Sequence, residues 1–303
     1  MYKNILPKFA ILLAAYNGTR WIEEQVDTIL NQRNVDVEIF ISIDISTDGT
    51  RILLENLYKN NAKIHILDDV QRFGGAAKNF YRLIKDVDFS RFDYLSLSDQ
   101  DDIWNSDKLY NAHQLISSQG YDAYSGNVEA FWEDGKTMLI DKAQEQTCCD
   151  YLFEAAGPGC TYVISNRLAM HIKEFLTANW SEVNKIELHD WFIYAFSRVN
   201  NYKWYIDKQT NMLYRQHDTN QVGVNSGIRA ILKRFMMIKS QWYREETIKI
   251  ITVLNLKSRY KFTSYIINKS FLNNLLLIGS LFSFRRKFSD KIFFLLVCSL
   301  GIY

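Results

Sequence analysis

Two carboxylates stand one residue apart in the segment S-D-Q-D-D-I-W (98–104), directly after a short apolar run. Asp99 and Asp101 can reach one divalent cation together with a diphosphate bound to it, and hard oxygen ligands of this kind favour Mg²⁺ or Mn²⁺. An isolated pair is more often a solvated acidic loop, or part of the first turn of a helix, where negative charge is favourable. The elements around the pair decide between these interpretations.

Four strand-like segments alternate with helical patterns in the first hundred residues. The predicted strands cover residues 9–14, 37–44, 63–67 and 94–98, and the first is a continuous apolar run, typical of a strand buried on both faces. This order predicts an α/β fold with a Rossmann-like, mostly parallel sheet flanked by helices. Ligands bind such sheets beyond the carboxyl ends of the strands.

Each of these predicted strands ends in polar residues. Tyr16 and Asn17 follow the first strand, Asp44 ends the second, Asp68 follows the third and the acidic segment 99–102 follows the fourth. Strand ends rich in carboxylate suit a metal-bridged phosphate ligand better than a bare anion. The position of the acidic pair therefore favours the metal site over the solvated loop.

The second half of the chain is less regular. Strands are expected at residues 121–129, 159–164 and 203–206, the last leading to residues 213–217, and helices are expected after Ser165 and after residues 189–191. From residue 228 onward the pattern is helical, with apolar residues that share one stripe. The members of this stripe are Ile228, Ile231, Leu232, Phe235, Ile238 and Trp242.

Charge is distributed unevenly along the chain. Residues 1–227 hold 22 of the 36 Lys and Arg and 31 of the 34 Asp and Glu, so they carry −9, whereas residues 228–303 carry +11. The two apolar runs of this tail, 271–284 and 292–302, are shorter than the roughly 18–20 residues that span a bilayer. Arg285, Arg286, Lys287 and Lys291 lie beside them, which suits a helix at the surface of an anionic membrane. A helical lid packed on the catalytic domain, or a second copy covering the apolar stripe as a homo-oligomer, are the alternatives.

Composition excludes several classes of protein. Apolar residues make up 48% and aromatic residues 15% of the 303 residues, which excludes a disordered chain. Four cysteines are too few and too unevenly placed for a disulfide framework or a closed zinc site, which favours a reducing, cytoplasmic compartment. The first residues lack the apolar core of a signal peptide. No nucleic-acid partner is expected.

Six short motifs occur in an order that is familiar from one enzyme family: A-A-Y-N-G (14–18), D-I-S-T-D-G-T (44–50), G-G-A-A-K-N-F (74–80), S-D-Q-D-D-I-W (98–104), H-D-W (189–191) and Y-R-Q-H-D-T-N-Q-V-G (214–223). The chain resembles the inverting glycosyltransferases of family 2, which have the GT-A fold, and the resemblance covers residues 9–223. The fourth and sixth motifs particularly resemble those of bacterial rhamnosyltransferases that build O-antigen or capsule polysaccharides.

The resemblance implies a role for each matching residue. Asp190 would be the catalytic base, and Asp99 and Asp101 would hold the metal ion, with Asp101 the direct ligand. The remaining positions would contact the nucleotide sugar: Ala15 and Tyr16 line the nucleotide pocket, Asp44 faces the base, Lys78 and Asn79 lie near the nucleotide and diphosphate, Asp99 lies at the donor, and His217 closes over the diphosphate. The chain departs from the family where D-D-G-S is usual, because a single carboxylate, Asp44, is followed by Ile45.

The implied activity is metal-dependent, inverting transfer of a sugar to a hydroxyl of a growing bacterial surface polysaccharide. The donor would be dTDP-L-rhamnose, or a UDP-hexose or UDP-N-acetylhexosamine, and the acceptor a polyprenyl-diphosphate-linked glycan at the inner face of the cell membrane. Residues 1–227 would form the GT-A catalytic domain, with the nucleotide sugar bound by about residues 1–120 and the acceptor by 121–227. Residues 228–303 would be a basic, apolar helical extension. A sugar-phosphate nucleotidyltransferase and a non-catalytic nucleotide-binding or membrane-scaffold protein are the rival classes.

Overall fold

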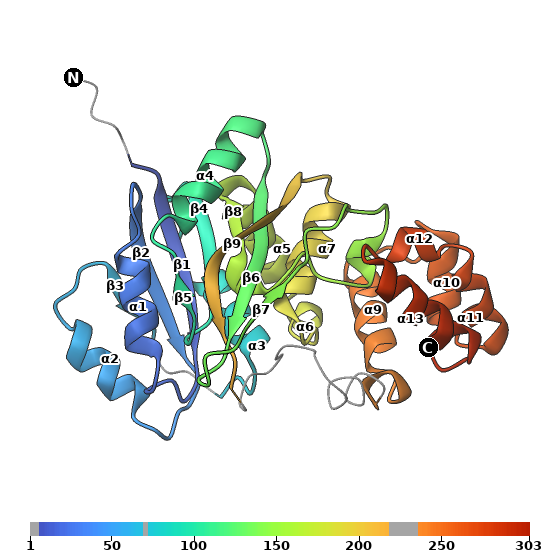
Figure 1. The fold of residues 1–303 in the computed structure, drawn as a ribbon, viewed down its shortest axis with the longest axis horizontal. Helices are drawn as coiled ribbons and strands as arrows, with labels where there is room; N and C mark the ends of the chain where they lie inside the picture. Colours follow the sequence, from blue (N-terminus) through green and yellow to red (C-terminus); the bar gives the residue numbers. More distant parts are fainter. Residues whose placement is uncertain (1–5, 69–71, 218–235) are drawn as a thin grey trace.

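A mixed β-sheet forms the centre of the molecule (Figure 1). In the computed structural model, which describes residues 6–68, 72–217 and 236–303, the sheet has nine strands in the order β3-β2-β1-β4-β8-β6-β9-β5, with β7 paired to β6. The strands β1 (Lys8–Ala15), β2 (Asp36–Ile43), β3 (Ile64–Ile66) and β4 (Tyr94–Ser98) are parallel to one another. All four strands predicted for the first half are confirmed.

The apolar run of β1 is buried on both faces because helices cover both sides of the sheet. Alternate residues of the strand belong to two separate cores: Ala10 and Leu12 to one, Ile11 and Leu13 to the other. The first core includes residues of α3 (Ala76–Asp86), α5 (Asn166–Ala178) and α7 (His189–Val199). The second includes residues of α1 (Ile22–Leu30), α2 (Thr50–Tyr58) and α4 (Lys108–Gln119). The predicted α/β class is therefore confirmed.

The second half departs from an all-parallel sheet. The strand β8 (Val163–Ser165) is antiparallel to β4, and β6 (Ala123–Phe131) is antiparallel to β8. The long strand β9 (Trp204–Arg215) pairs with β6 and with the short β5 (Ile103–Trp104), while β7 (Thr137–Ile140) closes a hairpin on β6. Short helical turns, η1 (Asp150–Leu152), η2 (Gly159–Thr161) and α6 (Trp180–Val183), complete this half.

The strand predicted at residues 159–164 is wrong in its first half. The backbone N–H of Thr161 donates to the carbonyl of Pro158, and that of Tyr162 to the carbonyl of Gly159, so this stretch closes into the turn η2. The extended backbone of β8 begins only at Val163. The turn carries the chain beside the first residues of α7, which matters for the site described below.

From Trp242 to the last residue the structure has five helices: α9 (Trp242–Val253), α10 (Lys261–Ile267), α11 (Phe271–Ile278), α12 (Leu281–Phe284) and α13 (Phe288–Ser299). They lie together beyond α7, at one end of the molecule (Figure 1). Of the predicted apolar stripe, residues 228–235 lie outside the described part of the chain. Gln241 has a left-handed backbone, with φ of 64°, so Ile238 and Trp242 do not belong to one continuous helix.

Buried ionic contacts join these helices to the segment around η1. The Arg286 guanidinium donates to Asp150 Oδ2 (2.9 Å) and to the Ala155 carbonyl oxygen (2.7 Å), and it lies 3.5 Å from the Glu154 carboxylate. Arg198 of α7 binds the other Asp150 oxygen at 3.0 Å. The prediction that Arg286 meets a membrane surface is therefore wrong, because its side chain is inside the protein. No described helix is long and apolar enough to cross a membrane.

Candidate active site

The loop after β1 is held by the loop before α2. The Gly18 N–H donates to Thr50 Oγ1 (2.8 Å), and the Thr19 N–H donates to Asp48 Oδ2 (3.0 Å). Thr50 and Asp48 belong to the D-I-S-T-D-G-T segment, so this motif fixes the backbone at the end of β1. The hydroxyl and carboxylate spacing of the motif thus has a structural use that is independent of the nucleotide.

Tyr16 is clamped by a side-chain amide from the acidic loop. Gln100 Oε1 accepts from the Tyr16 N–H, and Gln100 Nε2 donates to the Tyr16 carbonyl, both at 2.8 Å. A Cβ at Gly18 would collide with the same amide, so the glycine is required for this close approach. The Tyr16 ring is 47% exposed, which leaves it free to stack on a ligand beyond the sheet, and Ala15 is buried beneath it at the end of β1.

The Asp44 carboxylate anchors backbone. Its Oδ1 accepts from the Phe73 N–H (2.9 Å) and from the Ile45 N–H (2.8 Å), and its Oδ2 accepts from the Gly74 N–H (2.8 Å). The residue is only 4% exposed. Asp44 therefore fixes the start of the glycine segment that leads into α3, a task that the sequence does not reveal.

Lys78 and Asn79, adjacent on α3, lie in different environments. The Asn79 amide is buried and donates to the Ser42 carbonyl (2.9 Å) at the end of β2, while its Oδ1 has no hydrogen-bond partner among the described residues. Lys78 is exposed. Asn79 therefore stabilises the end of β2, and Lys78 is the residue of the two that a ligand can reach.

Two carboxylates and a thiol meet at the carboxyl end of β4. Oxygens of Asp99 and Asp102 and the Cys160 thiol lie within 4.8 Å of one another. Burial and the neighbouring Asp101 raise the pKa of Asp99 to about 7, and burial raises the pKa of Asp102 well above its usual range. Like charges confined in this way attract a cation. Burial also raises the pKa of the Cys160 thiol, so this group is a poor ligand for a hard cation.

Asp101 points to a different partner, His217. The His217 Nε2 lies 2.7 Å from Asp101 Oδ2, and the imidazole ring stacks on Trp21 with ring centroids 4.2 Å apart. The two residues are 116 positions apart in the sequence. The structure thus brings together the acidic motif and the Y-R-Q-H motif, as the resemblance implies.

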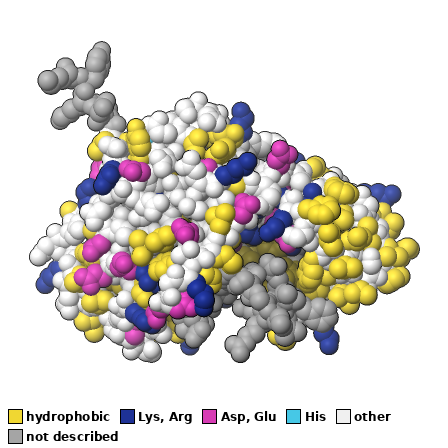
Figure 2. Space-filling model, in the orientation of Figure 1, with side chains coloured by type: hydrophobic (Ala, Val, Ile, Leu, Met, Phe, Trp, Pro, Cys, Tyr) yellow, Lys and Arg dark blue, Asp and Glu magenta, His cyan; other side chains and the backbone are white. Residues whose placement is uncertain are grey.

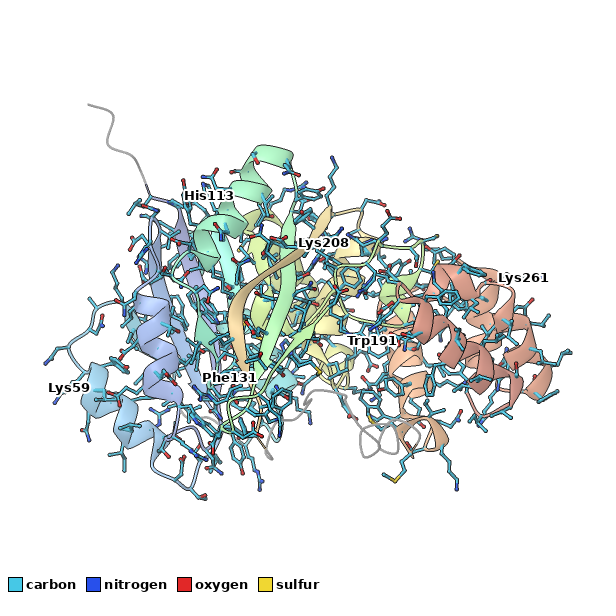
Figure 3. The ribbon with its side chains drawn as sticks, in the orientation of Figure 1. Lys59, His113, Phe131, Trp191, Lys208 and Lys261 are labelled. Atoms are coloured by element: carbon cyan, nitrogen blue, oxygen red, sulfur yellow. The ribbon has the colours of Figure 1, made fainter. Side chains whose placement is uncertain are left out.

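Arg215, which sequence reasoning left without a role, joins the same two motifs. Its Nε donates to the Asp101 carbonyl (2.8 Å), and its backbone N–H donates to Asp102 Oδ1 (3.2 Å). The guanidinium lies 4.6 Å from the ring centre of Phe131, at the end of β6 (Figure 3). The signal that could have identified Arg215 was its place in the Y-R-Q-H motif, two residues before His217.

Lys108 is a second residue that the sequence did not single out. Its ammonium donates to the Cys160 carbonyl (2.9 Å) and lies 3.0 Å from the ring centre of Trp104, and the residue is 1% exposed. Burial lowers its pKa to about 7, although Asp99 and Asp102 favour its charged form. A buried cation lies beneath the acidic cluster. The only signal for it in the sequence was its position, four residues after the tryptophan of the acidic motif.

Asp190 is the second residue of α7, beside the turn η2. One of its oxygens, Oδ1, accepts from the Trp191 N–H (2.8 Å). Burial raises the pKa of Asp190 to about 6, and the charge of Lys142 opposes this rise. The charge of Asp190 also contributes to the raised pKa of Asp99, so the two carboxylates lie near each other. A carboxylate with these properties suits a general base that works near neutral pH.

The adjacent glycine turn is shaped for this carboxylate. A Cβ at Gly159 would lie 2.6 Å from His189 Nε2 and 3.3 Å from the Asp190 Cβ, so only glycine fits against the start of α7. Burial lowers the pKa of His189 to about 3, which keeps this histidine neutral. Gly159 therefore lets the turn η2 pack closely against the first turn of α7.

The acidic cluster fits a divalent cation. Asp102 Oδ2 is buried without a hydrogen-bond partner among the described residues, and Asp99 and Asp101 add carboxylates from the same loop. Asp99 and Asp101 would hold the ion, and Asp102 lies close enough to contribute. Bound there, a cation would neutralise negative charge on a diphosphate.

The sequence shows which family this arrangement belongs to. A family model described as glycosyl transferase family 2 matches residues 10–157, and the chain belongs to this family of glycosyltransferases. It is 47% identical over 292 residues, 96% of this chain and 100% of the relative, to the dTDP-rhamnosyl transferase RfbG of Shigella flexneri. It is 33% identical over 168 residues, 54% of this chain and 64% of the relative, to the putative teichuronic acid biosynthesis glycosyltransferase TuaG of Bacillus subtilis.

Solved structures share the fold at low sequence identity. TarS of S. aureus, residues 1–349 in complex with UDP-GlcNAc, has a TM-score of 0.58 at 14% identity, covering 97% of this chain and 91% of that one. The mannosyltransferase PcManGT of Pyrobaculum calidifontis, in complex with GDP-Man and Mn²⁺, has a TM-score of 0.52 at 12% identity, covering 98% and 87%. The GT-A fold expected from the sequence is thereby confirmed.

Proposed function

We propose that this glycosyltransferase moves L-rhamnose from dTDP-L-rhamnose to a hydroxyl of a growing bacterial surface polysaccharide. The observation that carries the proposal is the 47% identity to a dTDP-rhamnosyl transferase across its full length. The geometry supports it, because the donor-side residues and Asp190 lie at one edge of the sheet. A bound Mg²⁺ or Mn²⁺ at Asp99 and Asp101 would stabilise the diphosphate leaving group.

In this proposal Asp190 removes the proton from the acceptor hydroxyl as that oxygen attacks the anomeric carbon. The attack comes from the face opposite the diphosphate, so one displacement inverts the anomeric configuration, and a β-linked donor gives an α-rhamnoside. General base catalysis of this kind contributes roughly 10²–10⁴-fold in rate. Tyr16 and Lys78, both exposed, would contact the nucleotide and the diphosphate.

A donor panel tests the proposal. The purified chain would be incubated with Mg²⁺ or Mn²⁺, a lipid-linked glycan acceptor and one of dTDP-L-rhamnose, UDP-glucose or UDP-N-acetylglucosamine, and the glycan analysed by mass spectrometry. We expect transfer from dTDP-L-rhamnose alone. Transfer from a UDP-sugar instead would replace the donor, and stable nucleotide binding without turnover of any donor would favour the non-catalytic class.

We further propose that the C-terminal helices hold the enzyme at an anionic membrane surface. Eight large apolar side chains of α11, α12 and α13 are exposed, as is Leu300 directly after α13, and Figure 2 shows apolar atoms gathered over this end of the molecule. The apolar face consists of Phe271, Leu272, Leu275, Leu276, Phe282, Phe288, Ile292, Leu296 and Leu300. Monomeric soluble proteins rarely expose apolar patches of this extent without a partner.

Charge favours a bilayer as that partner. Six basic side chains are exposed within residues 236–303, against one exposed carboxylate, Glu245. The basic set is Lys239, Lys257, Arg259, Lys261, Lys269 and Lys287. The Lys291 ammonium lies 5.2 Å from the ring centre of Phe282, so positive charge also borders the apolar face directly. Each Lys or Arg near an anionic surface adds about 1 kcal/mol of attraction.

Vesicle co-sedimentation across a salt series tests the surface. A variant with Phe282, Leu296 and Leu300 changed to Ser would lose binding to phosphatidylglycerol vesicles, because it removes buried apolar area from the membrane contact. The matched control changes Ile52 and Leu57 of α2, which are also exposed, and should bind normally. A concentration-dependent dimer that the triple variant abolishes, without vesicle binding by the unaltered chain, would show instead that a second copy covers this face.

A further inference from the structure

Lys142 is a lysine close enough to Asp190 to affect its pKa, and the reaction so far described leaves it unused. It follows the β7 strand, and its backbone N–H donates to Asn127 Oδ1 (2.7 Å). Asn127 is buried and also donates to Asp141 Oδ1 (3.1 Å) and to the Lys208 carbonyl (3.0 Å). The side chain of Lys142 lies against Gly157, whose Cβ position would be 3.8 Å from the Lys142 Cβ. The backbone that presents Lys142 is therefore fixed from three sides.

The Lys142 ammonium faces charges from four elements. Burial lowers the pKa of Lys142; the carboxylates of Glu154 and Asp290 oppose this shift, while Arg286 and Arg285 add to it. Lys142 in turn favours the ionised form of Asp190. No described residue accepts a hydrogen bond from the Lys142 Nζ or forms an ion pair with it. Arg286, in contrast, binds Asp150, Glu154 and the Ala155 carbonyl through its two terminal nitrogens. An ammonium group carries three donors, and those of Lys142 are available to a ligand.

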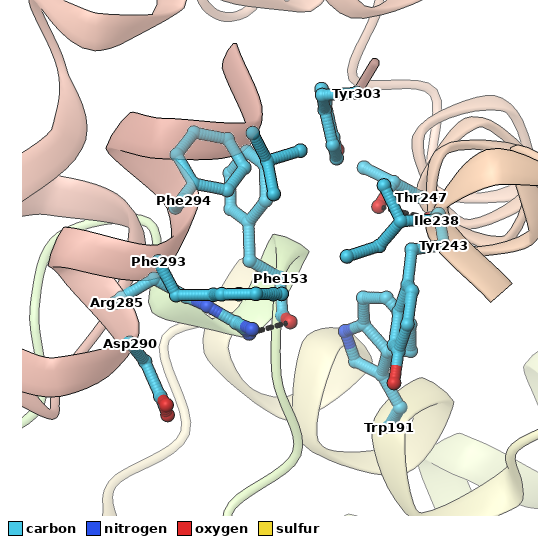
Figure 4. A pocket seen from close by; sticks show the side chains of 11 residues that line it. Phe153, Trp191, Ile238, Tyr243, Thr247, Arg285, Asp290, Phe293, Phe294 and Tyr303 are labelled. Carbon is cyan, nitrogen blue, oxygen red and sulfur yellow. Dashed lines mark hydrogen bonds between the residues drawn. The ribbon is translucent and has the colours of Figure 1, made fainter. Parts of the chain in front are cut away.

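The C-terminal helices border the same region. Arg285 and Asp290 line a cavity together with Trp191, the residue after Asp190, and with aromatic side chains of α9 and α13 (Figure 4). This cavity has a volume of about 70 Å³, far below the several hundred Å³ of a ligand pocket. A sugar cannot lie inside it, and neither Lys142 nor Asp190 is among the residues that line it.

The balance of charge around Lys142 identifies the kind of ligand. Three carboxylates (Asp190, Glu154 and Asp290) stand against three cations (Lys142, Arg285 and Arg286). A phosphate would be repelled by the carboxylates and would compete with established ion pairs. A neutral sugar, whose hydroxyls both donate and accept, can bind the ammonium and a carboxylate at once.

We infer that Lys142 binds the acceptor sugar, donating a hydrogen bond to a hydroxyl next to the one that Asp190 deprotonates. The inference rests on the proposed function in that it requires glycosyl transfer, but not on the identity of the donor. The phosphates of a lipid-linked acceptor would then lie outside this region. Lys142 would also favour the ionised form of Asp190. The carboxylate of Asp99 beyond β4 has the opposite effect, because it carries a like charge. Tyr81 of α3, Tyr162 before β8 and His189 also lie near Asp190 and are neutral.

Steady-state kinetics with the full chain test the inference, using whichever nucleotide sugar supports transfer. Lys142→Met should raise the acceptor KM by about tenfold or more, since a hydrogen bond from a charged group contributes roughly 1.5–3 kcal/mol. The donor KM should stay within twofold. Lys142→Arg, which keeps the charge and the donors, should recover part of the loss. Lys136→Met, on the same hairpin with a side chain that is 79% exposed, is the matched control and should behave as the unaltered enzyme.

Two further readouts separate acceptor binding from a structural role. In Lys142→Met the acid limb of kcat should move to higher pH, because removing a nearby cation raises the pKa of Asp190. Thermal melting of Lys142→Met and Lys142→Arg should match that of the unaltered chain. An unchanged acceptor KM, an equal rise in donor KM, or a loss of folding in both variants would overturn the inference. Absence of transfer by the unaltered chain with every donor would instead contradict the proposed function.

Discussion

Asp190 sets the pH range in which the enzyme can work. Its pKa is raised to about 6 by burial, so the carboxylate loses its basic form as the pH falls through about 6. We expect kcat to be constant above pH 7 and to fall about tenfold for each unit below pH 6. Asp190→Asn should bind dTDP and metal normally and lose transfer by at least roughly 10²-fold at every pH. Transfer within a few-fold of the unaltered rate would assign Asp190 to helix capping.

The Asp101–His217 pair couples donor binding to the closing segment. Asp101→Ala should abolish the thermal shift produced by Mn²⁺ with dTDP, and His217→Ala should reduce it, while melting of the free protein stays near that of the unaltered chain. The reason is that both side chains lie at a strand-end loop and contribute little to the core. Asp88→Asn, a change in a fully exposed carboxylate, is the control. Full activity of Asp101→Ala in excess chelator would contradict the metal site.

Removal of the Lys108 charge is expected to strengthen metal binding, whereas removal of Asp101 weakens it. The buried ammonium partly neutralises the acidic cluster, so Lys108→Met should bind Mn²⁺ more tightly, by several-fold in calorimetry. It should also lower stability without metal, because the carboxylates lose their nearest cation. Weaker metal binding by Lys108→Met, with the fold intact, would show that Lys108 positions the ligands through the Cys160 carbonyl rather than through its charge.

Several functional positions were predictable at the residue scale because motif order carries them. The sequence led to Asp99, Asp101, Asp190 and His217, and the structure brings the elements that carry them to one edge of the sheet. The backbone-anchoring task of Asp44 was not predictable, since its partners are amide groups 29 and 30 positions away. Arg215 and Lys108 were not predicted for the same reason. The role of a buried cation depends on the carboxylates and carbonyls that folding brings to it.

Elements were predictable where one physical signal dominates. The strand β1 is apolar throughout and is buried on both faces, and β4 ends where the acidic residues begin. The prediction failed at residues 159–161, where apolar and β-branched residues suggested a strand but turn hydrogen bonds formed instead. The two-residue strand β5 was also missed, because pairing with β9, more than 100 positions away, defines it and no periodicity can.

The close packing of the turn η2 against α7 leads to a prediction about how these two elements position Asp190. Gly159→Ala places a methyl group 2.6 Å from the His189 ring and should shift the first turn of α7, and with it Asp190. Overpacking of this kind costs about 1–3 kcal/mol of unfolding free energy. We expect kcat to fall at least roughly tenfold while nucleotide binding remains, because the donor side is untouched. Gly279→Ala, where the nearest atom is 3.5 Å away, is the control for the loss of a glycine.

Over the whole molecule, the C-terminal helices behave as part of the core. Residues such as Phe284, Phe294 and Ile250 belong to the same apolar cluster as α3 and α7. Arg286→Met leaves the Asp150 carboxylate buried with one guanidinium instead of two, and breaking a buried pair costs about 3–5 kcal/mol. Urea unfolding should show one transition with a midpoint lowered accordingly. Two separate transitions in the unaltered chain would contradict this joint core.

Lys287→Met, one position further along, gives the contrast. Its side chain is exposed, so unfolding should be unchanged, while binding to anionic vesicles weakens slightly at low salt. The two neighbouring basic residues thus report on different properties, Arg286 on stability and Lys287 on the surface. Equal effects of both changes on the urea midpoint would contradict the burial that separates them.

The Asp150–Arg286 contact also bears on how the chain is made. Asp150 emerges 136 residues before its partner, an interval of roughly 7–30 s at about 5–20 residues per second of synthesis. Until Arg286 is made, Asp150 has at most one of its two guanidinium partners, Arg198, and the apolar face next to it is open. A message that ends prematurely before codon 286 would therefore release an enzyme with every motif of its active site and no finished core. Such a product is expected to be bound by chaperones or degraded rather than to persist as a shorter transferase.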